Sequence, residues 1–145
     1  MNQIIGRKKE IKQLTEYYHS GKAEFVAVYG RRRIGKTYLV HNLFLDSFAF
    51  EMSGSIDAPL EAQLSNFGFA LREFGDSHQP IPSNWIEAFE ALKQLLKAKL
   101  SDNRLVVFID ELPCLDTRKS GFQQAFEHFW NGWASKQNEI MLIVC

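Results

Sequence analysis

Four short apolar segments, separated by stretches with helical periodicity, most strongly constrain the fold of this chain. The segments are residues 25–29, 48–52, 105–109 and 140–145. Three of them contain no charged side chain, which is typical of strands that are buried on both faces of a parallel sheet. Helices between consecutive strands would cover those faces. The sequence therefore predicts an α/β fold with three layers around a parallel sheet.

Apolar side chains recur at helical spacing in five further stretches. The stretches are residues 7–20, 36–44, 60–74, 85–100 and 120–136. Gly21 is predicted to end the first helix, and Asp57, with a proline two residues later, to start the third. Asn84, with Glu87 three residues later, is predicted to cap the fourth helix. Asp116 is interpreted as the cap of the last helix.

The composition is that of one domain with no overall charge bias. The chain has 145 residues, of which 17 are basic and 17 acidic, so its net charge gives no electrostatic reason to expect nucleic acid or an anionic membrane as a partner. No apolar run approaches the ~20 residues that span a bilayer, and the start of the chain lacks the apolar stretch of a secretory signal. We therefore expect a cytoplasmic protein in which Cys114 and Cys145 are reduced and unpaired.

A glycine-containing motif follows the first predicted strand and leads into a helix. Eight consecutive residues match the pattern GxxxxGK[ST]: Gly30, Arg31, Arg32, Arg33, Ile34, Gly35, Lys36 and Thr37. Glycines allow such a loop to turn tightly and to bring backbone N–H groups close to a phosphate. The N-terminus of the following helix adds a partial positive charge that favours an anion at the same place. The motif therefore predicts a phosphate-binding site.

Individual side chains of this motif have separate predicted roles. Lys36 would reach the β- and γ-phosphates of a nucleotide as a positive charge, and the hydroxyl of Thr37 would be a ligand of Mg²⁺. One of the three arginines is a candidate for holding phosphate charge, while a solvated basic loop tip is the alternative for at least two of them. The adjacent Tyr38 is included among the nucleotide-binding candidates.

Two carboxylates, Asp110 and Glu111, follow the apolar segment 105–109. Taken alone, acidic residues after a strand are common in solvated loops and at helix starts. In a parallel sheet, however, the carboxyl ends of the strands lie at one rim, so this pair is expected beside the glycine-containing motif. Asp110 would then hold Mg²⁺ together with Thr37, and Glu111 would polarise the attacking water. Lys36 and Glu111 are the predicted catalytic residues.

Together these motifs resemble the archaeal-type ATPase family, a group of bacterial and archaeal P-loop ATPases of the AAA+-like and STAND class. Residues 5–10 resemble its N-terminal GRxxE element, and residues 29–37 resemble its arginine-rich Walker A loop, YGRRRxGKT. Residues 109–113 resemble its Walker B segment with a trailing proline. The resemblance covers essentially the whole chain, and it implies that Gly6 and Arg7 lie near the adenine of a bound nucleotide.

The resemblance also implies a RecA-like (ASCE) P-loop NTPase fold with the strand order 5-1-4-3-2. On this basis residues 1–145 are the N-terminal part of an ATPase domain, truncated after the fourth strand. The fifth strand, a polar sensor residue, a helical lid and a C-terminal region of the family would follow Cys145. The strand at residues 25–29 would then lie at an uncovered edge, where self-association can occur. Without the sensor and an arginine finger, we expect weak or absent turnover.

The leading functional hypothesis is binding and hydrolysis of Mg-ATP that drives conformational change in a larger protein. The alternative is a nucleotide-dependent switch or scaffold with slow hydrolysis, and a DNA-binding or nuclease-like C-terminal region could act with either. A small-molecule kinase is disfavoured because such kinases generally lack an acidic pair directly after a strand. Zero net charge disfavours DNA binding by these residues alone. ATP is preferred over GTP only through the resemblance.

Overall fold

A single parallel sheet forms the centre of the protein. The computed structural model describes residues 8–28 and 35–145. Its four strands are β1 (Glu24–Ala27), β2 (Phe48–Ser53), β3 (Leu105–Asp110) and β4 (Ile140–Val144). They lie in the order β1-β4-β3-β2, and all three pairings are parallel. The predicted parallel sheet is confirmed, and the first strand lies at an edge of it, as the strand order inferred from the resemblance implies.

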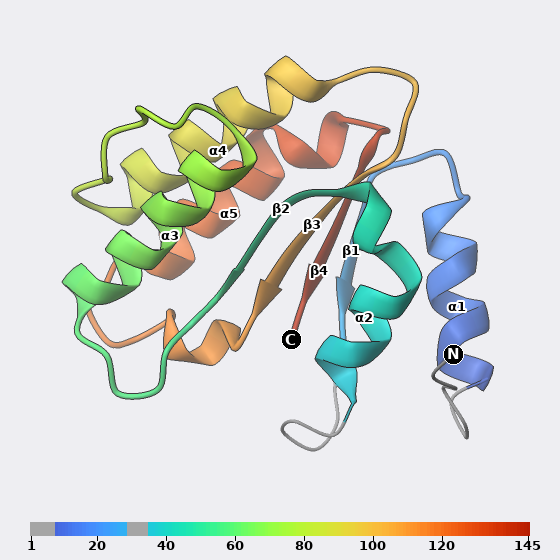
Figure 1. Ribbon diagram of the computed structural model, residues 1–145, viewed down its shortest axis with the longest axis horizontal. Helices are drawn as coiled ribbons and strands as arrows, with labels where there is room; N and C mark the ends of the chain where they lie inside the picture. Colours follow the sequence, from blue (N-terminus) through green and yellow to red (C-terminus); the bar gives the residue numbers. More distant parts are fainter. Residues whose placement is uncertain (1–7, 29–34) are drawn as a thin grey trace.

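Helices cover both faces of this sheet (Figure 1). One face carries α1 (Lys8–Tyr18) and α2 (Lys36–Phe44), and the other carries α3 (Leu60–Phe74), α4 (Trp85–Lys99) and α5 (Phe122–Gly132). Short 3₁₀ turns follow α2, β3 and α5 at Leu45–Ser47, Leu112–Cys114 and Ala134–Lys136. This arrangement confirms the predicted three layers.

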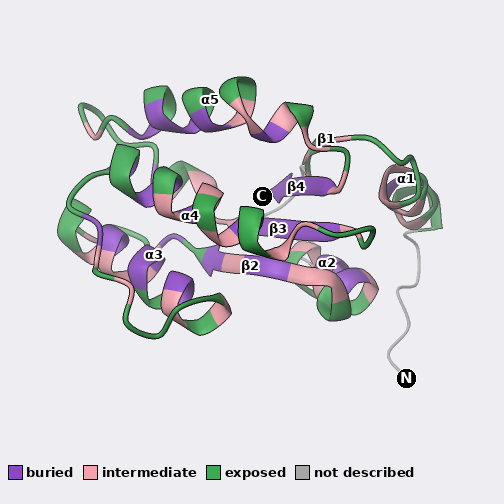
Figure 2. Cartoon of the chain, turned by 90° about the horizontal axis from the view of Figure 1, so that it is seen from above, coloured by how far each residue is buried: buried purple, intermediate pink, exposed green. Residues whose placement is uncertain are grey.

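The central strands bury both of their faces. In β3, Val106 and Phe108 pack against the α1 and α2 side, whereas Val107 and Ile109 pack against the side of α3, α4 and α5. Successive side chains of a strand point to opposite faces, so a strand between two helical layers needs apolar residues at every position. Figure 2 shows β3 and β4 coloured as buried between these layers. The prediction of two-sided burial is confirmed for both strands.

β1 differs from the prediction of a strand buried on both faces. It has one neighbour, β4, and its residues alternate between half-buried and exposed. Phe25 is 43% exposed, although its ring centroid lies 5.6 Å from that of Phe126 and 5.3 Å from that of Trp130, both on α5. An edge position leaves one side of each residue without a neighbouring strand, which explains this exposure. Tyr29, predicted as the last residue of this strand, lies outside the described residues.

The predicted helix ends at Gly21 and Asn84 are confirmed. Gly21 follows α1 with φ 75°, a left-handed conformation that glycine adopts without steric cost. The side chain of Asn84 accepts a 2.8 Å hydrogen bond from the backbone N–H of Glu87 and so caps α4. The predicted start of α3 is too early, because Asp57 has φ 57° and the helix begins only after Pro59.

Two predictions about the last helix are wrong. Asp116 is exposed and does not cap α5, which begins after Gly121, and the hydroxyl of Ser120 accepts the N–H of the first helical residue. The helix also ends earlier than predicted. Trp133 has φ −144° and ψ −57°, outside the helical range, so the regular helix stops at Gly132 and a 3₁₀ turn follows. Helical spacing of apolar residues continues through such a turn and therefore does not reveal it.

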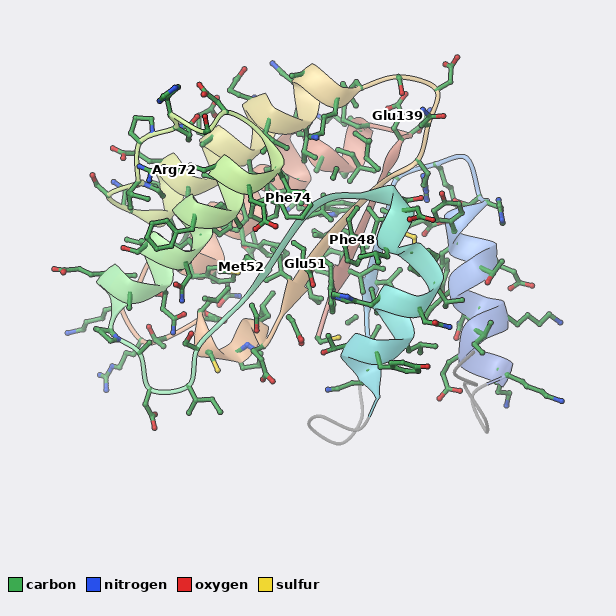
Figure 3. The ribbon with its side chains drawn as sticks, viewed as in Figure 1. Phe48, Glu51, Met52, Arg72, Phe74 and Glu139 are labelled. Atoms are coloured by element: carbon green, nitrogen blue, oxygen red, sulfur yellow. The ribbon has the colours of Figure 1, made fainter. Side chains whose placement is uncertain are left out.

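A histidine–carboxylate contact fixes α2 against β2. His41 Nε2 lies in hydrogen-bonding contact with Glu51 Oε2, and the His41 ring meets the Phe48 ring edge-on, with 5.2 Å between centroids. Figure 3 labels Phe48 and Glu51 along β2, next to α2. Because this contact lies in the second turn of α2, it holds the helix in one position over the sheet, with its first turn near the carboxyl edge.

A membrane-spanning helix needs about 20 predominantly apolar residues. Within the described part of the chain, no helix is long and apolar enough to meet that requirement. The cytoplasmic location expected from the sequence stays a prediction.

Candidate functional site

The carboxyl edge of the sheet brings together two residues that are far apart in the sequence. Thr37, in the first turn of α2, donates a hydrogen bond from Oγ1 to Oδ2 of Asp110, with 2.5 Å between the oxygens. The residues are 73 positions apart, and they meet because α2 begins at the edge where β3 ends. A hydroxyl and a carboxylate oxygen thus lie side by side at a helix N-terminus.

The start of α2 has the backbone geometry of an anion-binding site. Gly35 is the N-cap residue, with φ 73° and ψ 2°, and its carbonyl accepts the first intrahelical bond from Leu39 at 2.8 Å. A residue with a Cβ adopts this left-handed conformation at a steric cost. No side chain in the described part of the chain caps this helix end. The first N–H groups of a helix have no acceptor inside it, and the helix dipole makes them attractive to an anion.

Backbone groups orient the Asp110 carboxylate. Its Oδ1 accepts the N–H of Glu111 at 2.9 Å, while its main-chain carbonyl accepts the N–H of Gly54 at 2.9 Å. Oδ2 is the oxygen that faces Thr37. The carboxylate therefore has a fixed direction, because one oxygen is hydrogen-bonded to a backbone N–H and the other faces the start of α2.

Glu111 has a left-handed backbone, with φ 53° and ψ 42°. For a residue with a side chain this conformation costs roughly 1–2 kcal/mol. Two hydrogen bonds of about 3 Å support it: Leu112 N–H donates to the Cys145 carbonyl at 2.9 Å, and Cys114 N–H donates to the Glu111 carbonyl at 3.0 Å. Within residues 8–28 and 35–145, the Glu111 carboxylate accepts no hydrogen bond. The strained turn thus presents a carboxylate directly after Asp110.

Cys145 is a member of this site that sequence reasoning missed. It follows β4, and its N–H donates to the Ile109 carbonyl at 3.1 Å. Burial raises the pKa of its thiol to about 12, and the Asp110 carboxylate acts in the same direction, whereas the Lys36 ammonium acts against it. The Cys145 carbonyl also accepts the N–H of Leu112 at 2.9 Å, so the residue lies beside the turn that follows Asp110 and Glu111. The rule that sites form beyond the carboxyl ends of parallel strands, applied to the segment 140–145, could have identified it.

The Cys145 thiol is expected to react slowly with iodoacetamide. In a Cys114→Ser variant, Cys145 is the single remaining cysteine of the chain. Because its pKa is raised to about 12, little thiolate is present at pH 8, and alkylation should be roughly tenfold or more slower than in the urea-unfolded variant. The labelling rate should still rise above pH 10. A rate in the folded protein that levels off near pH 9 would contradict the raised pKa.

Gly54 is a second residue that the sequence analysis did not single out. It comes directly after β2, whose last residue, Ser53, is in register with Asp110. A Cβ added to Gly54 would lie 2.6 Å from the Glu111 carbonyl oxygen, which is too close for any real side chain. Glycine is therefore required for the close approach of the two loops. A glycine two residues after the predicted strand 48–52 was the available signal.

The donor atoms of the site fit magnesium. Mg²⁺ prefers oxygen ligands and is usually bound by one or two protein side chains, several waters and substrate phosphates. The Thr37 hydroxyl and the Asp110 carboxylate supply two such oxygens. Within the described residues, no group of three or more His, Cys, Asp and Glu side chains is arranged to hold a metal ion. Two oxygen donors are within the number that a Mg²⁺ site usually takes from protein side chains.

The structure describes part of the predicted site. The predicted residues Gly35, Lys36, Thr37, Tyr38, Asp110 and Glu111 are described. Lys36 is half-buried, and Tyr38 is 40% exposed. The other predicted residues lie outside the described ranges: Gly6, Arg7, Gly30, Arg31, Arg32, Arg33 and Ile34.

One protein family matches the chain. Residues 4–145 match the model of an ATPase domain predominantly from Archaea. No curated protein matches the sequence significantly. The family match and the four-stranded parallel sheet agree with a RecA-like P-loop NTPase-type fold, and they support a general ATPase-type function. The resemblance to the archaeal-type ATPase family is thereby confirmed, and the chain belongs to this family of ATPase domains found predominantly in Archaea.

Proposed function

We propose that this chain binds Mg-ATP and hydrolyses it. The observation that carries the proposal is the contact between Thr37 and Asp110, which pairs a hydroxyl with a carboxylate at the N-terminus of α2. Oxygen ligands of this kind suit Mg²⁺, and a helix N-terminus suits phosphate. A bound Mg²⁺ would neutralise negative charge on the β- and γ-phosphates. Membership of an ATPase family supports the same chemistry.

Four described residues have proposed roles in the reaction. Lys36 would bind the β- and γ-phosphates, and Thr37 and Asp110 would hold the magnesium ion. Glu111 orients the attacking water and accepts its proton. The water oxygen forms a bond to the γ-phosphorus while the bond from that phosphorus to the β,γ-bridging oxygen breaks. The products are ADP and inorganic phosphate.

The remaining roles are proposed from the sequence. Gly30, Ile34 and Gly35 shape the loop around the phosphates, one of the three adjacent arginines adds positive charge, and Tyr38 contacts the nucleotide. Gly6 and Arg7 lie near the adenine. Residues 1–145 form part of an ATPase domain in which turnover drives conformational change, with a DNA or protein partner bound by a further region.

Thermal unfolding with Mg-ATP tests the proposed binding site. Mg-ATP at a hundred times its dissociation constant should add ~2.7 kcal/mol to the free energy of unfolding, which corresponds to a rise in Tm of roughly 5–10 °C. Lys36→Ala should abolish the rise, and chelation of Mg²⁺ should reduce it in the wild type. Lys97→Ala is the matched control, because Lys97 is an exposed lysine in the last turn of α4. Equal shifts in the wild type and Lys36→Ala would refute phosphate binding by this loop.

We also propose that copies of this chain associate with one another through the open edge of β1. Within the described residues β1 has a strand neighbour on one side only, and Phe25 beside the open edge is 43% exposed. Open strand edges pair with other chains, and a charged residue on the edge prevents this. Sedimentation at rising micromolar concentration should show a growing mean mass, and Ala27→Lys should lower it. A monomer throughout this range would contradict the proposal.

A further inference from the structure

Gln63 is an unusual residue in the core of this protein. It lies in the first turns of α3 and is 3% exposed, and it is the one buried polar side chain among the described residues. Burial of an amide is unfavourable unless its donors and acceptor are all hydrogen-bonded. The partners of Gln63 therefore indicate why a polar side chain is retained there.

The Gln63 amide joins two loops at the carboxyl edge of the sheet. Its Oε1 accepts the N–H of Ser55 at 3.0 Å, and its Nε2 donates to the Ser55 carbonyl at 2.7 Å. Nε2 also donates to the Cys114 carbonyl at 3.3 Å. Ser55 belongs to the loop after β2, whereas Cys114 belongs to the 3₁₀ turn directly after Glu111. One side chain thus binds both loops through their backbones.

The segment that carries Glu111 is held from two sides. On the β4 side, Leu112 N–H donates to the Cys145 carbonyl. On the β2 side, Gly54 N–H donates to the Asp110 carbonyl, and a Cβ on Gly54 would lie only 2.6 Å from the Glu111 carbonyl oxygen. The Gln63 bonds fix this second side to α3, which packs in the core through Leu64 and its neighbours.

Glu111 needs such support because its backbone is in the left-handed conformation, with φ 53°. A non-glycine residue remains in the left-handed region only where the surrounding structure specifies that conformation. The direction of a side chain changes with its backbone angles, so relaxation of φ at Glu111 would move the carboxylate. A displacement of about 1 Å in a catalytic group can lower a rate roughly 100-fold.

We propose that Gln63 is a positioning residue that holds the Glu111 carboxylate in place by binding the loop after β2 to the turn after β3. This proposal rests on the proposed role of Glu111 in ATP hydrolysis. Gln63 is 3% exposed, and its side-chain amide is bonded to the two loops, so we expect it to act on Glu111 through these loops rather than by contact with the nucleotide. Its loss should therefore change turnover and leave nucleotide affinity intact.

The test compares Gln63→Met with Asn66→Ala. Methionine keeps the length and the helix propensity of the side chain but lacks both donors and the acceptor. Asn66 donates from Nδ2 to the Ser55 hydroxyl at 3.2 Å, so Asn66→Ala loses a bond to the same loop but none to the turn after Glu111. The readouts are the dissociation constant of Mg-ATP, kcat, and amide hydrogen exchange of Leu112 and Cys114 in the nucleotide-free protein.

In Gln63→Met we expect the Leu112 and Cys114 amides to exchange about fivefold faster, as for the loss of one hydrogen bond. We expect kcat to fall roughly tenfold with an unchanged dissociation constant. Asn66→Ala should change neither. Exchange rates equal to those of Asn66→Ala would overturn the proposal, as would a fall in kcat that is matched by weaker Mg-ATP binding. If the wild type binds Mg-ATP without turnover, proposed hydrolysis fails, and the exchange comparison alone decides whether Gln63 holds the turn.

If Gln63→Met does not unfold cooperatively, and so is not properly folded, Gln63→Glu is the variant to use in its place. Its carboxylate keeps the acceptor for Ser55 N–H but has no donor for the Cys114 carbonyl, and protonation restores one donor. The ratio of its kcat to that of the wild type should therefore rise as the pH falls from 8 toward 5. A ratio that does not depend on pH would overturn the proposal.

Discussion

Glu111→Gln should reduce the weak ATP turnover expected of residues 1–145 by a further factor of roughly 100 to 1,000 and leave the dissociation constant of Mg-ATP within a few-fold of the wild type. An amide has nearly the size of a carboxylate but cannot accept the proton of the attacking water. Within the described residues, the Glu111 side chain makes no hydrogen bond whose loss would disturb the fold. Single-turnover hydrolysis and Mg-ATP titration measure the two quantities separately.

Glu127→Gln is the matched control for this experiment, because Glu127 is an exposed glutamate on α5, away from the site. It should change neither quantity. An undiminished kcat in Glu111→Gln would exclude Glu111 as the base. A wild type that binds Mg-ATP but hydrolyses it no faster than Glu111→Gln would favour a nucleotide-dependent switch over an ATPase that turns over.

Phe67→Ala should lower the free energy of unfolding by about 3–5 kcal/mol. Phe67 is 0% exposed, and its ring centroid lies 4.9 Å from Phe50, 5.6 Å from Trp85 and 5.4 Å from Phe89. These rings join β2, α3 and α4, so a cavity at their centre removes contacts in two layers. A typical domain has a free energy of unfolding of roughly 5–15 kcal/mol, so this loss would remove a large part of the stability. Urea unfolding measures it.

Phe69→Ala on the same helix is the control. Phe69 is 55% exposed, so its removal should cost less than about 1 kcal/mol. The two variants delete the same side chain two positions apart on α3 and differ in burial. A loss below 1 kcal/mol in Phe67→Ala, or equal losses in the two variants, would show that the aromatic cluster is not the centre of the core.

The sequence predicted the structure best where a single physical requirement determines which residues occur. Residues 105–109 and 140–144 form central strands, and a strand between two helical layers has to be apolar at every position. The close approach of Thr37 and Asp110 followed from a general rule about the carboxyl ends of parallel strands. Helix ends with side-chain or glycine caps, at Asn84 and Gly21, were also predictable from local chemistry.

The remaining features depend on contacts that local sequence does not encode. The apolar residues of β1 resemble those of a buried strand, and only the order of the strands shows that it lies at an edge. The left-handed conformation of Glu111 depends on support from Gly54, Gln63 and Cys145, all of which lie far from it in the sequence. A buried glutamine in an amphipathic helix looks like any polar residue until its partners are known.

The order of the strands in the sheet also determines when each strand can find its partner during synthesis. Glu24 of β1 pairs with Met141 of β4, 117 positions later in the chain (141 minus 24). At ~5–20 residues per second, a ribosome needs roughly 6–23 s to make that stretch. β2 likewise waits for β3, its only strand neighbour in the described sheet. Chaperones that shield nascent apolar strands should therefore bind this chain early, before β4 has emerged.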